Sequence, residues 1–151
     1  MREKLNLRRT HPPSAAQLEQ FGNPVHCVRL SRDGLVYVCD RLNNRVQVFR
    51  KDGSFVKEFG VEPQTAGNGS VWDVALSRDP QQRYLFLADG RNNQVVTLRR
   101  DTGAVVSTLG RPGRYAGEFH WVHDLAIDSM GNLYAGEVDN GKRVQRFARQ
   151  H

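Results

Sequence analysis

The chain has 151 residues, a length that usually forms one domain, and its 38% hydrophobic and 25% charged residues are ordinary for a folded globular protein. No run approaches the roughly 18 apolar residues of a membrane-spanning helix, and the charged start, residues 1–9, has no apolar stretch behind it, so we expect neither a membrane span nor an export signal. The net charge is +6, but the 18 arginines are spread along the chain and never form a block, which favours a solvated surface over a nucleic-acid site.

The N-terminal residues 1–22 are predicted to be an extended leader, because they contain His11-Pro12-Pro13 and show no alternating pattern. After them come short runs rich in β-branched and aromatic residues, separated by turn signals such as Asp33-Gly34 and Asp52-Gly53. In chain order, the predicted strands are residues 25–30, 35–39, 45–50, 54–59, 71–76, 83–88, 94–99, 104–109, 121–127, 132–136 and 143–148.

These strands form a threefold internal repeat. The acid that ends the second strand of each unit lies 49 and then 48 residues after its predecessor, at Asp40, Asp89 and Glu137. A period of this size, with four short strands per unit, is typical of β-propeller blades. We interpret Asp40 and Asp89 as structural, because a short carboxylate before an Asn-rich turn can accept backbone N–H bonds.

Two cysteines flank the turn at residues 31–34. If Ser31 pairs with Leu35, Cys27 and Cys39 lie directly opposite each other, close enough for a disulfide. If the register differs by one residue, they face opposite sides of the sheet. The sequence leaves both arrangements open.

The repeat resembles the NHL repeat, on the basis of its Val-x-Leu strand, Tyr37-Val38-Cys39-Asp40, Asn43-Asn44-Arg45-Val46 and the closing Phe59-Gly60. The resemblance implies an all-β, NHL-type β-propeller with blades at residues 23–60, 61–110 and 111–148, the last lacking its outer strand. Three blades are too few to close a ring. We therefore expect the rest of a six-bladed ring to come from the same gene product or from a second protomer.

The first strand of each blade starts with a residue that should face the central channel: His26, Trp72 and His123. Histidine in alternate blades of a six-bladed ring would place three imidazoles around the axis, an arrangement that binds zinc and leaves a fourth position open. Trp72 and its neighbour Asp73 are the candidate ligand-binding residues of the middle blade.

The histidine spacing is similar to that of the peptidyl-α-hydroxyglycine α-amidating lyases, which are six-bladed NHL-type enzymes. The resemblance implies that His26 and His123 are two of three zinc ligands, that Arg41 is the catalytic arginine, and that Asp124 helps to hold a calcium ion. It also implies that the third histidine and the catalytic tyrosine belong to blades outside this chain. Where the middle blade might have supplied a tyrosine, it has Arg91.

Three functions follow from these patterns. The favoured one is a scaffold that binds a small ligand or a peptide at the channel mouth. The alternative is a metal-dependent lyase or hydrolase, with zinc and calcium in a complete ring. The third is binding of single-stranded RNA, the least favoured, through arginines beside an aromatic side chain. Its candidate residues are Arg91, Arg111, Arg114, Arg143 and either Tyr115 or Trp121.

Overall fold

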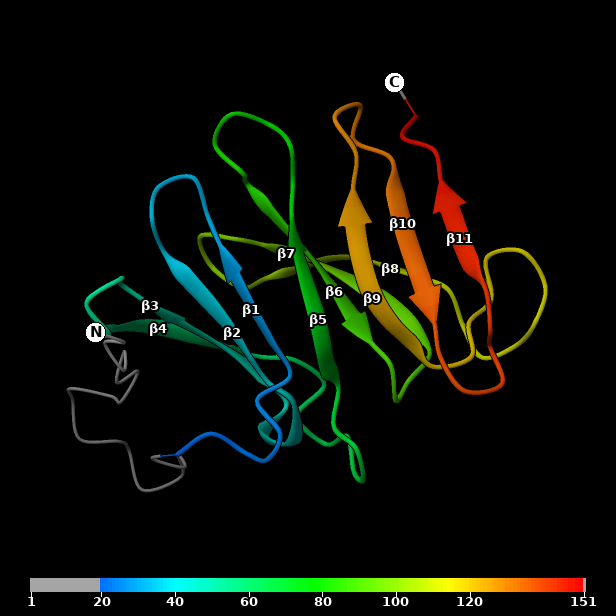
Figure 1. Cartoon of the computed structure of the whole chain (residues 1–151), viewed down its shortest axis with the longest axis horizontal. Coiled ribbons are helices and arrows are strands. Elements are labelled where there is room, and N and C mark those ends of the chain that lie inside the picture. The colour runs from blue at the N-terminus through cyan, green and yellow to red at the C-terminus, as the bar shows by residue number, and fades with distance from the viewer. Residues whose placement is uncertain (1–19, 151) are drawn as a thin grey trace, which may run out of the picture.

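The computed structural model describes residues 20–150, which form three antiparallel β-sheets side by side (Figure 1). Each sheet is a meander in which strands follow chain order, and we call the sheets blades 1, 2 and 3. Blade 1 contains β1 (Cys27–Leu30), β2 (Val36–Asp40), β3 (Arg45–Phe49) and β4 (Phe55–Gly60), with the short 3-10 helix η1 (Arg41–Asn43) between β2 and β3. Blade 2 contains β5 (Val71–Leu76), β6 (Tyr84–Asp89), β7 (Gln94–Arg99) and β8 (Val105–Leu109), and blade 3 contains β9 (Val122–Ile127), β10 (Leu133–Glu137) and β11 (Val144–Phe147).

The all-β prediction is confirmed, and every observed strand begins and ends within two residues of its predicted range. Blade 3 has three strands among the described residues, as predicted. Residues 1–19 of the predicted leader lie outside the described part of the chain. Its end contacts blade 1, where Phe21 packs against Phe49 and the backbone N–H of Gly22 donates to Asp40 at 2.7 Å. Within residues 20–150, no helix has the length and apolar character needed to cross a membrane.

The register of the β1–β2 hairpin shows that Cys27 and Cys39 lie opposite each other. Ser31 N donates to Leu35 O across the turn, and Gly34 has a φ of 83°, a left-handed conformation that glycine adopts without a steric penalty. In this register Cys27 pairs directly with Cys39, and the two form a disulfide. The side chains are buried, so the bridge joins the first two strands inside the fold.

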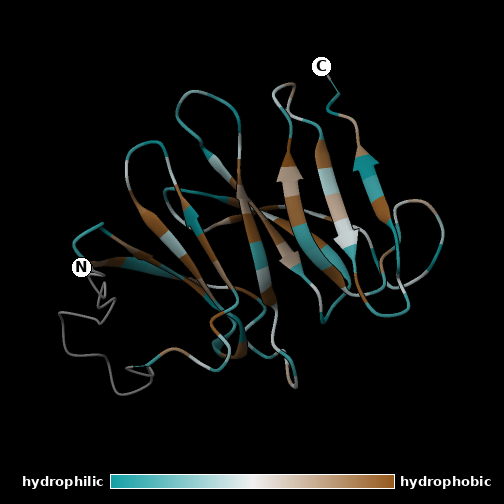
Figure 2. Cartoon of the chain, in the orientation of Figure 1, coloured by the Kyte–Doolittle hydropathy of each residue, from teal (hydrophilic) through white to brown (hydrophobic). Residues whose placement is uncertain are grey.

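The hydrophobic core lies between the blades, and blade 2 supplies both of its halves. Successive residues of β7 point to opposite faces, so Val96 packs toward blade 1 and Val95 toward blade 3. The same alternation in β6 sends Leu87 toward blade 1 and Ala88 toward blade 3. Figure 2 shows hydrophobic segments alternating with hydrophilic ones along the strands, while most connecting loops are hydrophilic or neutral. Each blade therefore buries its apolar side chains against its neighbour, as stacked repeats require.

The acids at the ends of the second strands are structural, as predicted. Asp40 is fully buried and accepts hydrogen bonds from Gly22, Asn43 and Arg45, with the Arg45 Nε contact at 2.6 Å. In blade 2, Asp89 accepts from Asn92 and Gln94 in the same way. Each carboxylate thus closes the turn that follows it.

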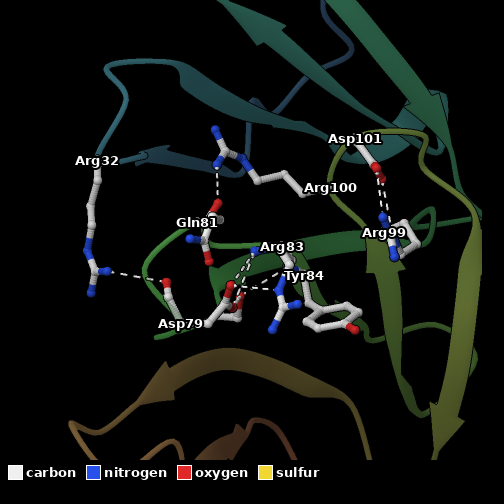
Figure 3. A network of polar contacts seen from close by, with 9 residues as sticks. Arg32, Asp79, Gln81, Arg83, Tyr84, Arg99, Arg100 and Asp101 are labelled. Carbon is white, nitrogen blue, oxygen red and sulfur yellow. Dashed lines mark hydrogen bonds and ion pairs between the residues drawn. The ribbon is translucent and has the colours of Figure 1, made fainter.

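Blades 1 and 2 are also joined by polar contacts, at the ends of the inner strands away from His26. There Arg100 donates from Nε to the Tyr37 hydroxyl at 2.7 Å, from Nη1 to Gln81 O at 3.0 Å, and from Nη2 to Asp33. Figure 3 shows the contact of Arg100 with Gln81 and, within blade 2, the nearby Arg99–Asp101 ion pair, whose atoms lie 2.8 Å apart. The side chains line a cleft of about 350 Å³, and their mutual contacts hold the two blades together.

Candidate functional site

Two of the predicted mouth residues, Trp72 and His123, owe their direction to irregularities in strand pairing. Val71 pairs with Asp89 and Asp73 with Ala88, which leaves Trp72 as the extra residue of a β-bulge. Blade 3 repeats this feature, because Val122 pairs with Glu137 and Asp124 with Gly136, leaving His123 unpaired. A bulge bends the strand and re-aims the extra side chain. Equivalent positions of two blades therefore turn toward the same place.

The structure brings all three predicted mouth side chains together. The ring centroids of His26 and His123 lie 4.9 Å apart, and Trp72 lies 5.7 Å from His26 and 5.4 Å from His123. Trp72 is held from two sides. Its Nε1 donates to Gly69 O at 2.8 Å, and Gly90 lies so close to the ring that a Cβ atom there would be 2.4 Å from Trp72 Cδ2. The buried indole is thus held in a fixed position beside two partly exposed imidazoles.

Both histidines use Nδ1 for a contact within the protein. His26 Nδ1 lies 2.6 Å from Trp72 O, and His123 Nδ1 lies 3.1 Å from Asp124 Oδ2. A carbonyl and a carboxylate can only accept, so Nδ1 carries the proton in both neutral rings. Nε2 then has a free lone pair, as in histidines that bind metals while their other nitrogen is fixed by a carbonyl or carboxylate.

The charge state of His26 is shifted by its surroundings. Burial lowers the pKa of His26, and the nearby charges of Arg41 and His123 act in the same direction. The hydrogen bond to Trp72 O and the carboxylate of Asp124 act against that shift without reversing it. His26 is therefore neutral at pH 7.

Arg41, the predicted catalytic residue, begins η1 and lies against the same cluster. Its Cζ atom is 5.1 Å from the centroid of the Trp72 ring, within the range of a cation–π contact. Its Nε is buried and has no hydrogen-bond partner in the described part of the chain. Burial lowers the pKa of Arg41, but a guanidinium stays charged at neutral pH. The mouth therefore holds a fixed cation with unused hydrogen-bonding capacity.

The two predicted aspartates occupy different environments. Asp124 has a side chain that is 73% exposed beside His123. Asp73 is buried, accepts from Leu125 N at 2.9 Å and forms an ion pair with Arg29 Nη2 at 2.6 Å. It thereby connects the inner strands of all three blades and does not face the mouth. Burial raises the pKa of Asp73, while those two partners oppose the shift.

Sequence reasoning missed His120 and did not place Trp121 in this cluster. The Trp121 ring lies 5.8 Å from Trp72, and His120 stacks on Trp121 at 5.9 Å with an angle of 15° between the planes. Nε2 of His120 is buried, 3.6 Å from Asp139 Oδ2. The two residues precede β9 where blade 2 has Gly69-Ser70, so the repeat offered no counterpart from which to infer their direction.

Two of the four arginines proposed for RNA binding form ion pairs within their own blade. Arg111 pairs with Glu118 at 2.9 Å, and Arg143 pairs with Glu137 at 2.6 Å. Arg91 and Arg114 are exposed, and Tyr115 is 81% exposed. RNA binding stays a prediction.

Comparison with known proteins supports the repeat and the fold. The NHL repeat model matches residues 25–49, which contain β1 to β3. Among solved structures, a protein of unknown function from Bacteroides caccae aligns with a TM-score of 0.59 and 15% identity, covering 77% of this chain and 39% of that one.

Two enzymes have similar folds. The catalytically inactive H270A virginiamycin B lyase from Staphylococcus aureus, solved with quinupristin, aligns with a TM-score of 0.60 and 16% identity over 87% of this chain and 43% of the lyase. A streptogramin B lyase aligns with a TM-score of 0.59 and 17% identity over 85% and 39%. This chain thus spans less than half the length of each of these three structures. Together, the repeat match and the shared fold identify residues 20–150 as blades of a β-propeller, with an NHL repeat in blade 1.

Proposed function

We propose that this chain is part of a propeller scaffold that binds a small ligand or peptide bearing a carboxylate at the mouth formed by His26, Arg41, Trp72, Trp121 and His123. The observation that carries the proposal is the buried Nε of Arg41, which has no hydrogen-bond partner among the described residues. Leaving a buried donor of a charged group unpaired is costly, and a ligand carboxylate would satisfy it. Trp72 is only 3% exposed and lies behind Arg41, so the partly exposed indole of Trp121 would offer the same ligand an apolar contact.

Intrinsic fluorescence provides a direct test, because both tryptophans of the chain belong to this mouth. We would titrate a panel of acetylated tripeptides that differ in the last residue, each as the free acid and as the C-terminal amide. At least one free acid should change the fluorescence saturably, and its amide should bind at least about tenfold more weakly.

Variants locate the binding site. Arg41→Gln should abolish the preference for the free acid, whereas Arg114→Gln, the same change at an exposed arginine, should leave binding unchanged. If no acid in the panel binds, or if the Arg41 variant keeps the preference, the proposal fails.

A second candidate, a metal-dependent lyase or hydrolase in the complete ring, is favoured by the free Nε2 atoms of His26 and His123. These two side chains fit part of a three-histidine zinc site, and the third ligand would come from a blade outside this chain. Zinc bound there would polarise a substrate oxygen or activate water. Arg41 would orient a substrate carboxylate, and Asp124 would keep His123 in the tautomer that presents Nε2. Two matched propellers are named lyases, but their likeness to this chain concerns the fold alone.

Elemental analysis of the assembled ring tests this candidate. Wild-type protein should carry stoichiometric zinc, and His26→Ala and His123→Ala should each lose it. If the wild-type ring lacks stoichiometric metal, or if the variants retain it, the metal-dependent enzyme is excluded and the binding scaffold is the remaining proposal.

A further inference from the structure

A second group of potential metal ligands lies away from the mouth histidines. The ligand atoms of Cys27, Cys39 and Asp73 all lie within 4.8 Å of one another, and the three residues are buried. The cysteines are paired across β1 and β2, and Asp73 reaches them from β5 of the next blade. The group therefore spans the interface between blades 1 and 2.

One carboxylate oxygen of Asp73 is held by an ion pair alone. Its Oδ2 accepts the hydrogen bond from Leu125 N. Its Oδ1 lies 2.6 Å from Arg29 Nη2, but the alignment of that contact leaves Oδ1 without a hydrogen bond. Arg29 has a side chain that is 40% exposed, so it can turn toward solvent when a metal ion takes its place.

The donor set suits zinc when the cysteines are reduced. Two thiolates and one carboxylate are typical zinc ligands, and a fourth tetrahedral position would remain for water. With zinc–sulfur distances of about 2.3 Å, the two sulfur atoms of a tetrahedral site lie about 3.8 Å apart. The Cα atoms of Cys27 and Cys39 are 4.8 Å apart on paired strands, so rotation of the side chains can open the sulfur atoms to that separation without moving the backbone.

We propose that Cys27, Cys39 and Asp73 form a redox-gated zinc site: the disulfide excludes the metal, and reduction by a dithiol creates the site. In the reduction, the dithiol gives two electrons and two protons to the disulfide, which becomes two thiols while the dithiol becomes a disulfide. Zinc binding then releases the two thiol protons and leaves both sulfur atoms as thiolates. This site is independent of the ligand proposed for the mouth.

The experiment uses Co²⁺ as a spectroscopic probe on the whole chain, reduced with a phosphine and desalted without oxygen. Reduced protein should bind one Co²⁺ with a thiolate-to-cobalt charge-transfer band in the near ultraviolet, and Zn²⁺ should displace it. The unreduced protein should show no such band. A reduced chain without this band, or an unreduced chain that shows it, would overturn the proposal.

Variants assign the ligands. Cys39→Ser should remove the charge-transfer band, and Asp73→Asn should weaken Co²⁺ binding by at least about tenfold. Asp124→Asn makes the same change at an exposed carboxylate and should leave the affinity unchanged, as should the double variant His26→Ala/His123→Ala. Equal affinity in Asp73→Asn and wild type, or loss of the band in the histidine variant, would refute the assignment.

Because Asp73 also connects three strands, poor folding is a second explanation for weak Co²⁺ binding by Asp73→Asn, so the wild type supplies an independent measurement. X-ray absorption of the zinc-loaded, reduced chain should show two sulfur ligands and two lighter ones. A shell with four sulfur atoms, or with fewer than two, would contradict the proposed site.

Discussion

The guanidinium Nε of Arg100 in blade 2 donates to the phenolic oxygen of Tyr37 in blade 1 at 2.7 Å. Tyr37 is fully buried, and burial raises the pKa of its hydroxyl. Arg100 itself is anchored to Asp33 and to Gln81 O. One side chain thus satisfies a buried polar group and joins two blades.

We predict that Arg100→Met lowers the free energy of unfolding by about 1–3 kcal/mol, because it leaves the buried Tyr37 hydroxyl without this donor. Chemical denaturation measures the change. The matched control is Arg99→Met, which removes an ion pair whose side chains are 45% and 59% exposed and should change stability by less than about 0.5 kcal/mol. Equal losses of stability in the two variants would show that the Arg100–Tyr37 contact stabilises the fold no more than an exposed ion pair does.

The close approach of Gly90 to Trp72 gives a second prediction. A methyl group at residue 90 would overlap the indole, so Gly90→Ala should displace Trp72, shift the tryptophan fluorescence and destabilise the fold by about 1–3 kcal/mol. Gly60→Ala is the control, because a Cβ atom there meets nothing within 4 Å. If Gly90→Ala keeps the wild-type emission spectrum, the indole is not fixed by this contact.

The disulfide between Cys27 and Cys39 should contribute substantially to stability. It links residues 12 apart in sequence, and constraining a loop of this size in the unfolded chain is worth about 3 kcal/mol. Melts with and without reductant should differ accordingly. The double variant Cys27→Ala/Cys39→Ala should not respond to reductant, and a response there would mean that the reductant acts elsewhere.

The sequence predicted the blades closely because the repeat supplies three copies of the same signals. In blade 1, Asp33-Gly34 places the turn of the hairpin, which left two possible registers for the pairing of Cys27 and Cys39. It could not choose between them, because the register depends on the hydrogen bonds across the turn. The hydrogen bond from Ser31 N to Leu35 O decides the choice.

The candidate site was less predictable. The repeat placed His26, Trp72 and His123 at equivalent positions, but the bulges at Trp72 and His123 depend on strand pairing. Asp73 was predicted to bind ligand together with Trp72. After the bulge, however, Asp73 points into the interface between the blades, where Arg29 and Leu125 contact it. Neighbouring residues of a strand point to opposite faces, so Trp72 and Asp73 contribute to different parts of the structure.

The last prediction concerns pH and starts from the stability of the fold. The pKa of His26 in the folded chain is below its ordinary value of 6.5. As the pH falls below about 6.5, the unfolded chain takes up this proton before the folded chain does, so His26 makes the fold less stable until the pH passes its folded pKa. His26→Gln should therefore lose less thermal stability than wild type between pH 8 and pH 5. Parallel losses in the two proteins would contradict the shifted pKa.

Protonation of His26 should have opposite effects on the two candidate functions of the mouth. Protonated His26 would place a second cation near Arg41, so an acidic tripeptide should bind more tightly as the pH falls through the lowered pKa. Metal binding needs the neutral imidazole and should weaken over the same range. Fluorescence titrations of the tripeptide and zinc analysis of the assembled ring, each at several pH values with His26→Gln alongside, distinguish the trends. Since that variant lacks the titrating group, peptide binding that strengthens equally in it and in wild type would exclude His26 as the cause.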